Sequence, residues 1–356
     1  MKLALSLALV GALLLLPGAA ANAQEELSFG TLAPDNTPWS DILKNFKKNV
    51  QKATKGRIKV KLFINGVLGD EPQMLQKMKF GQLTGGGFST GGVSTVVPEL
   101  QVFELPFLFQ NNEEVDYVMD KICRQDMEKY CEQRGLFLYI WAENGWVDIG
   151  HKKKPIRSLA DLKGEKMHMQ ETEIKKAFWT AVGASPIPLA VTDVLGALQR
   201  GTVDGFDTTP IFGSATQWTT ETKYWTDSNH IYQPAAVVFD LKWWKALSED
   251  DRKTILSFAE ELQTAARRDV RTEYGPDGQP VKGLEKDLFD EFRKAKIEII
   301  PLDATAREEF RVATLKVADE MIAKGVFSRD LYEKVSKAIE EFRAKKKSTN
   351  TGGAGG

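Results

Sequence analysis

Apolar and polar residues follow two distinct patterns in the first part of the chain. Segments 27–33 and 57–64 alternate between apolar and polar residues, which is typical of half-buried strands. The segment between them carries apolar residues at helical spacing, namely Ile42, Leu43, Phe46 and Val50. A loop and a short helix at 72–82 follow the second strand. This β–α–β–α order predicts an α/β sheet with crossover helices.

Similar patterns continue toward the C-terminus. They predict strands at 135–146, within 164–170 and from 231, helices at 158–162 and 175–183, and buried irregular chain at 93–109. Thr192 is expected to cap a helix that Gly201 ends. Ser248 begins a capping box for a long helix that reaches about Thr272, where the segment 273–280 breaks it. Further helices are expected from Thr305 to about Arg343, followed by a disordered tail at 344–356.

The first 23 residues have the features of a signal peptide, and we do not expect them to be part of the fold. Lys2 precedes the apolar run 3–16, and Ala21-Asn22-Ala23 forms a small-residue cleavage site, so we expect cleavage before Gln24. A membrane anchor is the alternative, but the run is short for a bilayer span. Loss of Lys2 changes the formal net charge from −1 to −2. We therefore expect an exported, soluble protein.

Composition and motifs argue against several classes of protein. A net charge near zero gives no basic surface for nucleic acid. The glycine-rich segment 83–92 lacks the spacing of a nucleotide-binding loop, and the three histidines fit no metal motif, so neither a cofactor nor a metal is expected. Cys123 and Cys131 lie too far apart to bridge on one helix, although a turn would bring them closer; a disulfide is slightly disfavoured. No catalytic motif points to an enzyme.

Several segments, in order, resemble one family of transport proteins. They are GVLGDEPQMLQKMKFGQL, VPELQVFELPFLF, PIRSLADLKGEKM, FWTAVGASPIPLAVTDVLGALQRGTVDG and NHIYQPAAVVFDLKWWKALSEDD. Together they resemble the substrate-binding proteins of tripartite ATP-independent periplasmic (TRAP) transporters of the DctP type. The resemblance covers roughly Leu27 to Phe342.

The resemblance implies a two-lobed α/β periplasmic binding-protein fold, type II-like, with a long helix spanning both lobes. On that fold, 24–146 form the first part of lobe 1, 147–234 the first part of lobe 2, 235–272 the return to lobe 1 with the spanning helix, and 273–343 a C-terminal segment packed mainly on lobe 2. A small ligand binds between the lobes, which close on it and deliver it to an ion-gradient-driven TRAP permease. The receptor is expected to act as a monomer in the periplasm.

The family's ligand-binding arginines are replaced in this chain. His168 stands where the KGxKxR strand of the family ends in an arginine that holds the ligand's carboxylate. A second family arginine follows an NG-aromatic turn, where this chain has Val147, or Asp148 if the alignment slips by one. Thr208 matches the ligand-contacting asparagine of the family's VDGQENP segment, and Phe206 and Asp207 replace its Gln and Glu. Because a buried anion needs compensating charge, the ligand is expected not to be a simple dicarboxylate.

The predicted ligand-binding residues come from both lobes. They are His168, Trp146, Val147, Thr208, Phe206, Asp207, Gln170, Trp39, Phe88, Ser89, Thr90 and Trp218. His168 is either a ligand contact or a packed core residue, and Trp146 either stacks on the ligand or packs at the hinge. For Trp218, packing is favoured.

Two ligand hypotheses stay open. The first is a neutral or weakly acidic, partly apolar or aromatic solute. The second is an ordinary organic acid held by His168 and neutral donors, whose affinity would weaken as pH rises if His168 binds it in protonated form. A sensory binding protein without transport is a further alternative.

Overall fold

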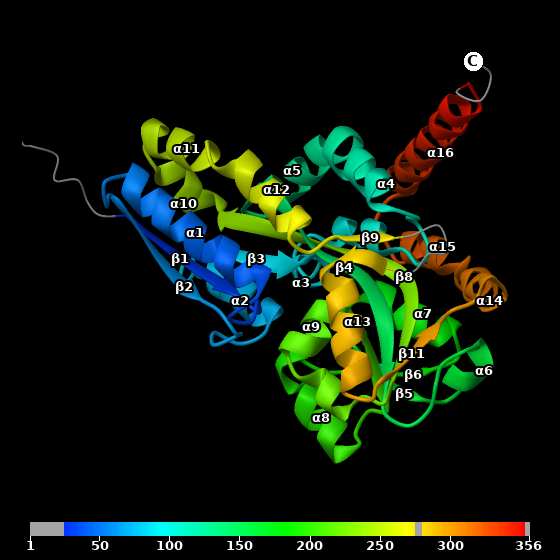
Figure 1. The fold of residues 1–356 in the computed structure, drawn as a ribbon. Coiled ribbons are helices and arrows are strands. Elements are labelled where there is room, and N and C mark those ends of the chain that lie inside the picture. The colour runs from blue at the N-terminus through cyan, green and yellow to red at the C-terminus, as the bar shows by residue number, and fades with distance from the viewer. Residues whose placement is uncertain (1–24, 275–279, 353–356) are drawn as a thin grey trace, which may run out of the picture.

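One twisted sheet of nine strands runs through the whole molecule. The computed structural model describes residues 25–274 and 280–352; the expected signal peptide and its cleavage site lie outside the described residues. The strand order is β2-β1-β3-β8-β4-β7-β5-β6, and β11 also pairs with β8 (Figure 1). Two long strands, β4 (Leu136–His151) and β8 (Tyr224–Asp240), lie antiparallel at its centre. They connect the two halves of the sheet, which we call lobe 1 and lobe 2.

Lobe 1 contains the N-terminal strands of the sheet. Its elements are β1 (Glu25–Thr31), α1 (Pro38–Ala53), β2 (Ile58–Phe63), α2 (Glu71–Lys79), β3 (Gly85–Ser89), α3 (Thr90–Val93), η1 (Pro98–Glu104), α4 (Asn112–Asp116), η2 (Tyr117–Ile122) and α5 (Arg124–Gln133). The strands β2 and β3 pair in parallel with β1. The predicted β–α–β–α start is confirmed, and the segment expected to be buried and irregular contains a 3₁₀ helix, η1.

Lobe 2 contains the middle of the chain. Its elements are α6 (Leu159–Leu162), β5 (Lys166–Met169), α7 (Glu173–Ala181), β6 (Ser185–Pro188), η3 (Val191–Asp193), α8 (Val194–Arg200), β7 (Gly205–Thr208), α9 (Pro210–Ala215) and η4 (Trp218–Glu221). β5 pairs in parallel with β6 and β7, and β7 pairs antiparallel with β4. Gly201 ends α8 in the left-handed conformation, as expected. Thr192, in contrast, lies inside the turn η3 and does not cap α8.

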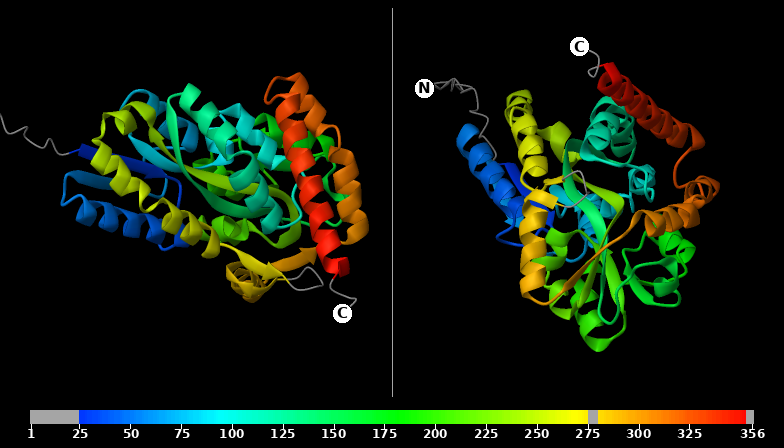
Figure 2. Two further views of the ribbon diagram at one scale, coloured as in Figure 1. Left: turned by 90° about the horizontal axis from the view of Figure 1, so that it is seen from above. Right: turned by 45° about the vertical axis from the view of Figure 1, so that its right-hand side comes forward.

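The C-terminal part of the chain returns to lobe 1 and passes along lobe 2, and its last helix packs back on η2 of lobe 1 (Figures 1 and 2). Its elements are α10 (Leu241–Ala246), α11 (Glu249–Leu256), α12 (Ala259–Arg268), β9 (Thr272–Tyr274), β10 (Pro280–Gly283), α13 (Leu284–Lys294), β11 (Glu298–Pro301), α14 (Ala304–Thr314), α15 (Val317–Ala323) and α16 (Arg329–Gly352). The disordered tail expected from residue 344 is wrong in its first part, because α16 continues to Gly352. The lobe boundaries expected at residues 146, 234 and 272 remain predictions.

The single helix expected from Ser248 to Thr272 is two helices. Ser248 caps α11 by accepting from the Asp251 amide, as predicted. The helix then breaks at Ser257 and Phe258. The Ile255 carbonyl accepts from the Phe258 amide at 3.2 Å and also from the Tyr139 hydroxyl, which tightens the turn there. Sequence periodicity does not register such a tertiary hydrogen bond.

The cysteines are both free and buried. Cys123 lies between η2 and α5, and Cys131 lies on α5, so no disulfide joins them. Burial raises the pKa of each thiol to about 12. The slight preference against a disulfide is confirmed.

Candidate functional site

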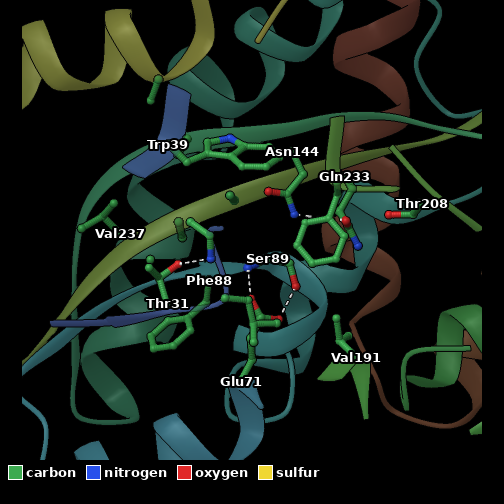
Figure 3. Close-up of a pocket in the computed structure, with 18 of the residues that line it drawn as sticks. Thr31, Trp39, Glu71, Phe88, Ser89, Asn144, Val191, Thr208, Gln233 and Val237 are labelled. Atoms are coloured by element: carbon green, nitrogen blue, oxygen red, sulfur yellow. Dashed lines mark hydrogen bonds between the residues drawn. The ribbon is translucent and has the colours of Figure 1, made fainter. Parts of the chain in front are cut away.

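A cavity of about 110 Å³ lies between the two lobes (Figure 3). Lobe 1 contributes residues from β1, α1, α2 and β3, and lobe 2 contributes residues from β5, α7, β7, α9 and η4. The two crossing strands β4 and β8 form its back wall. Most of the wall is apolar: Leu32, Ala33, Trp39, Ile42, Leu43, Phe88, Ile140, Ala142, Val147, Val191, Phe212, Trp218, Ala235, Ala236, Val237, Leu262 and Ala266.

Nine of the twelve predicted ligand-binding residues line this cavity. They are Trp39, Phe88, Ser89, Val147, His168, Gln170, Asp207, Thr208 and Trp218. Residues from six elements that are distant in sequence therefore meet around one space. The preference for packing at Trp218 is met only in part, because its ring packs against Phe206 and Phe212 and also lines the cavity.

The other three predicted residues do not line the cavity. Trp146 lies on the opposite face of β4 from Val147. Its ring packs on Tyr232, and its Nε1 donates a hydrogen bond to Asn112 Oδ1 at 3.0 Å. Phe206 precedes Asp207 on β7 and is fully buried against Trp218 and Trp225. Thr90 is buried and donates from Oγ1 to Glu104 and the Pro234 carbonyl. Phe206 and Thr90 are thus buried in the core, and Trp146 is half-buried at its edge.

Lys175 is the cation of the cavity, and the sequence analysis missed it. Its Nζ lies 2.5 Å from Asp207 Oδ2, and both side chains are almost completely buried, with 3% and 2% exposed. Burial alone would raise the pKa of Asp207, but the charge of Lys175 and the nearby His230 hold that pKa well below its usual range. Asp207 is thus ionised and neutralises Lys175.

His168 is held in its neutral form. Burial lowers the pKa of His168 to about 4, against the opposing effect of Asp207. Its Nε2 lies 3.2 Å from the Leu189 carbonyl oxygen, and its ring meets Trp218 edge to face at 5.6 Å between centroids. Near neutral pH this histidine therefore supplies no positive charge to a bound anion. Among the described residues, no arginine lines the cavity either.

A hydrogen-bonded bridge joins the lobes at the edge of the cavity. Glu71, at the start of α2, accepts from the Ser89 amide at 2.7 Å and from its hydroxyl at 2.5 Å (Figure 3). From lobe 2, Gln170 donates from Nε2 to Glu71 Oε2 at 3.0 Å and to Ser89 Oγ at 3.2 Å. Nearby, the Val191 amide donates to Asp70 Oδ2 at 2.9 Å. We call the Glu71–Ser89–Gln170 group the interlobe bridge.

The glycine-rich segment makes room for the interlobe bridge. A Cβ atom on Gly91 would lie 2.2 Å from Gln170 Oε1, and one on Gly92 would lie 2.2 Å from Glu71 Oε2. Both distances are far shorter than a van der Waals contact. Glycine is therefore needed at both positions because the bridge side chains approach the backbone closely there.

Three polar residues complete the cavity wall. Thr31 comes from the end of β1, and Asn144 and Gln233 face each other on β4 and β8, where Asn144 Nδ2 donates to Gln233 Oε1 at 3.1 Å. Trp39, on the facing side, donates from Nε1 to the Glu143 carbonyl at 2.9 Å. The wall thus offers neutral donors and acceptors beside one neutralised ion pair.

A second group of buried acids lies outside the cavity. Oxygens of Asp148, Asp227 and Glu285 lie within 4.8 Å of one another. Asp148 already accepts from the Trp225 ring at 2.8 Å and from the Ser228 and Asn229 amides, both at 2.9 Å. Burial, together with the charge of Asp227, raises the pKa of Asp148 well above its usual range, so protonation relieves the crowding.

Comparison with known proteins identifies the family of this chain. The model of bacterial extracellular solute-binding protein family 7, DctP, matches residues 29–325. The chain belongs to the DctP family. It is 27% identical over 300 residues to a solute-binding protein of Verminephrobacter eiseniae, covering 84% of this chain and 90% of that protein. Family members are periplasmic solute-binding proteins and not enzymes.

Two solved structures share the fold. The first is the sugar acid binding protein DctPAm of Advenella mimigardefordensis in complex with galactonate, with 26% identity, a TM-score of 0.82 and coverage of 89% of this chain and 98% of that chain. The second is a TRAP periplasmic solute-binding protein of Bordetella bronchispeptica with density interpreted as pantoate, with 25% identity, a TM-score of 0.79 and coverage of 88% and 99%. The two-lobed α/β fold is thereby confirmed.

None of the described helices is long and apolar enough to cross a bilayer.

Proposed function

We propose that this DctP protein is the receptor of a TRAP transporter for an uncharged or weakly acidic, partly apolar solute. The observation that carries the proposal is the buried Lys175–Asp207 pair, which leaves the cavity wall without net positive charge. The lobes close on the solute, and the closed form delivers it to the membrane subunits of the permease. We propose that it does so as a monomer, after export to the periplasm.

The charges that face the cavity disfavour a dicarboxylate. Lys175 is neutralised by Asp207, and His168 is neutral. The remaining carboxyl group in the wall, on Glu71, has its pKa raised to about 8 by burial. Transfer of an anion into this site costs solvation energy that no unpaired cation returns. An uncharged solute avoids that cost.

The solved relatives supply a set of probes for this proposal. One binds galactonate and another carries density interpreted as pantoate, so each acid can be compared with its uncharged lactone. Isothermal titration calorimetry should show galactonolactone or pantolactone binding more tightly than galactonate, pantoate or succinate. Tighter binding of the acids would contradict the proposal.

One observation favours a second candidate, a monocarboxylate receptor. Lys175 lines the cavity, and a ligand carboxylate could take the place of Asp207 as its partner if Asp207 gained a proton. This candidate predicts stronger acid binding at low pH, which falls away as pH rises. The hypothesis of an acid held by protonated His168 has no support, because the pKa of His168 lies at about 4.

A further inference from the structure

His168 carries one proton, and its position is fixed by Leu189. A carbonyl oxygen only accepts hydrogen bonds, so the Nε2 atom, 3.2 Å from the Leu189 oxygen, is the protonated nitrogen. The ring is neutral because burial lowers its pKa to about 4. Nδ1 is therefore a bare hydrogen-bond acceptor.

This acceptor is buried and has no partner within the described part of the chain. His168 is only 2% exposed, and Nδ1 makes no hydrogen bond to any described residue. The side chain nevertheless lines the solute cavity. A buried acceptor without a donor is unfavourable, and few native groups remain in that state. A group that enters the cavity is the remaining source of a donor.

The surroundings of His168 also favour a donor on the solute. Asp207 lines the same cavity, and both Lys175 and His230 approach its Oδ2 atom. Trp218 holds the His168 ring edge to face, so the ring does not turn freely. The lobe 2 side of the cavity is therefore richer in acceptors than in free donors.

We propose that His168 Nδ1 accepts a hydrogen bond from a hydroxyl or N–H group of the bound solute and so selects solutes that carry such a donor. This inference rests on the proposed function, because it concerns the solute of the same cavity. It makes His168 a specificity-determining residue that recognises a hydroxyl group and not a carboxylate. The solute class is then an uncharged or weakly acidic hydroxylated molecule.

Two variants separate the two nitrogens of His168. In His168→Asn the side-chain oxygen can replace Nδ1 as acceptor, whereas the donor to Leu189 is lost. In His168→Gln the amide can replace the Nε2 donor to Leu189, whereas the Nδ1 acceptor is lost. Both variants remove the ring that meets Trp218, so each controls for the other.

The probes are four compounds on one carbon skeleton. Pantolactone and 3,3-dimethyl-γ-butyrolactone differ by one hydroxyl group, and pantoate and 3,3-dimethylbutanoate are the acids with and without hydroxyls. Calorimetry on the mature wild-type chain should show pantolactone binding at least tenfold more tightly than its deoxy counterpart. His168→Gln should reduce that ratio toward one, and His168→Asn should keep most of it. The ratio cancels any general loss of affinity in a variant.

The two proposals fail in different ways. Preference for the acids over the lactones would contradict the uncharged solute, while the ratio between the two acids would still test His168. An unchanged ratio in His168→Gln, equal binding of both members of each pair, or binding of none of the four would overturn the role of His168. So would a proton on Nδ1, which two-bond ¹⁵N–¹H spectra of histidine-labelled protein detect without any ligand. His168→Gln identifies the signal.

Discussion

Lys175 and Asp207 meet across lobe 2 as a buried ion pair, with 2.5 Å between Nζ and Oδ2. Lys175 lies in the first turn of α7, and Asp207 lies on β7 beside the solute cavity. His230 lies 3.5 Å from the same carboxylate oxygen. Lys175 places a positive charge at the cavity, and the Asp207 carboxylate neutralises that charge. Under the proposed function, the energetics of this pair decide which solutes bind.

Breaking this pair from one side should destabilise the fold. Lys175→Met leaves the Asp207 carboxylate buried without its counterion, and we expect a loss of about 3–5 kcal/mol in the free energy of unfolding. The double variant Lys175→Met/Asp207→Asn should recover most of that loss, because no unpaired charge remains. Urea denaturation of both single variants and the double variant measures the coupling. The exposed Lys44–Asp35 pair is the control, and its removal should change stability little. Additive effects at Lys175 and Asp207 would show that the pair is not coupled.

Freeing the cation should change the solute that binds. Asp207→Asn leaves Lys175 without its counterion, and the cavity then carries one uncompensated positive charge. We expect the affinity for pantoate to rise at least tenfold relative to that for pantolactone, measured by calorimetry. Asp41→Asn removes a charge from the exposed surface of α1 and should leave the ratio unchanged. No change in Asp207→Asn would mean that Lys175 does not face the solute.

The interlobe bridge should depend on the absence of a side chain at Gly91. A methyl group there would displace the Gln170 amide, which is the end of a flexible chain, so we expect Gly91→Ala to fold. Loss of its two hydrogen bonds should weaken closure by about 1–2 kcal/mol, which is roughly 5- to 30-fold in solute affinity. Gln170→Ala should have the same effect, and the double variant should show no further loss. Small-angle scattering should report a more open average shape for all three, and additive losses would contradict the bridge.

Glu71 should make the protein less stable as pH rises. Burial raises its pKa from 4.5 to about 8, so the folded state holds a proton that the unfolded state releases. Its contribution is complete below about pH 4.5 and is lost as pH rises toward 8. Asp148 and other buried acids with raised pKa values act in the same direction, so the test is the difference between wild type and Glu71→Gln. That difference should change with pH across this window by at most about 1.4 kcal/mol per unit. Parallel pH profiles for the two proteins would refute the raised pKa.

The free thiols give a separate test of the lobe 1 core. Both thiols are buried, with pKa values raised to about 12, so a disulfide reagent such as DTNB should not react with the folded protein. After denaturation, both thiols should react, and a reducing agent should leave the melting temperature unchanged. A melting temperature that falls on reduction would indicate a disulfide.

Local pattern predicted most of the fold, whereas the resemblance to the DctP family led to the residues that line the cavity. The alternating segment around His168, the helix from Pro38 and the glycine at residue 201 all form as the sequence indicates, because local spacing and capping determine them. The break at Ser257 follows from a hydroxyl on Tyr139, which no local pattern reveals. Val147 lines the cavity and Trp146 does not, because successive side chains on a strand point to opposite faces of the sheet.

The charge balance of the cavity could not be predicted from the sequence. Lys175 reads as a solvated lysine beside Lys176, and its partner is 32 residues away on another element. One signal was present: Lys175 lies next to Ile174 on α7 and borders its apolar face, where a lysine needs a partner. Glu71 likewise reads as an ordinary acid in the first turn of a helix, where it suits the helix dipole. Only the packing of Ser89 and Gln170 around it reveals the bridge.

We propose that the cavity favours an uncharged solute because Asp207 neutralises Lys175. The most direct measurement is mass spectrometry of the small molecule released when freshly purified protein is denatured. The proposed charge balance predicts a neutral or weakly acidic, hydroxylated and partly apolar compound. Release of a dicarboxylate, or of another strong organic acid, would contradict it.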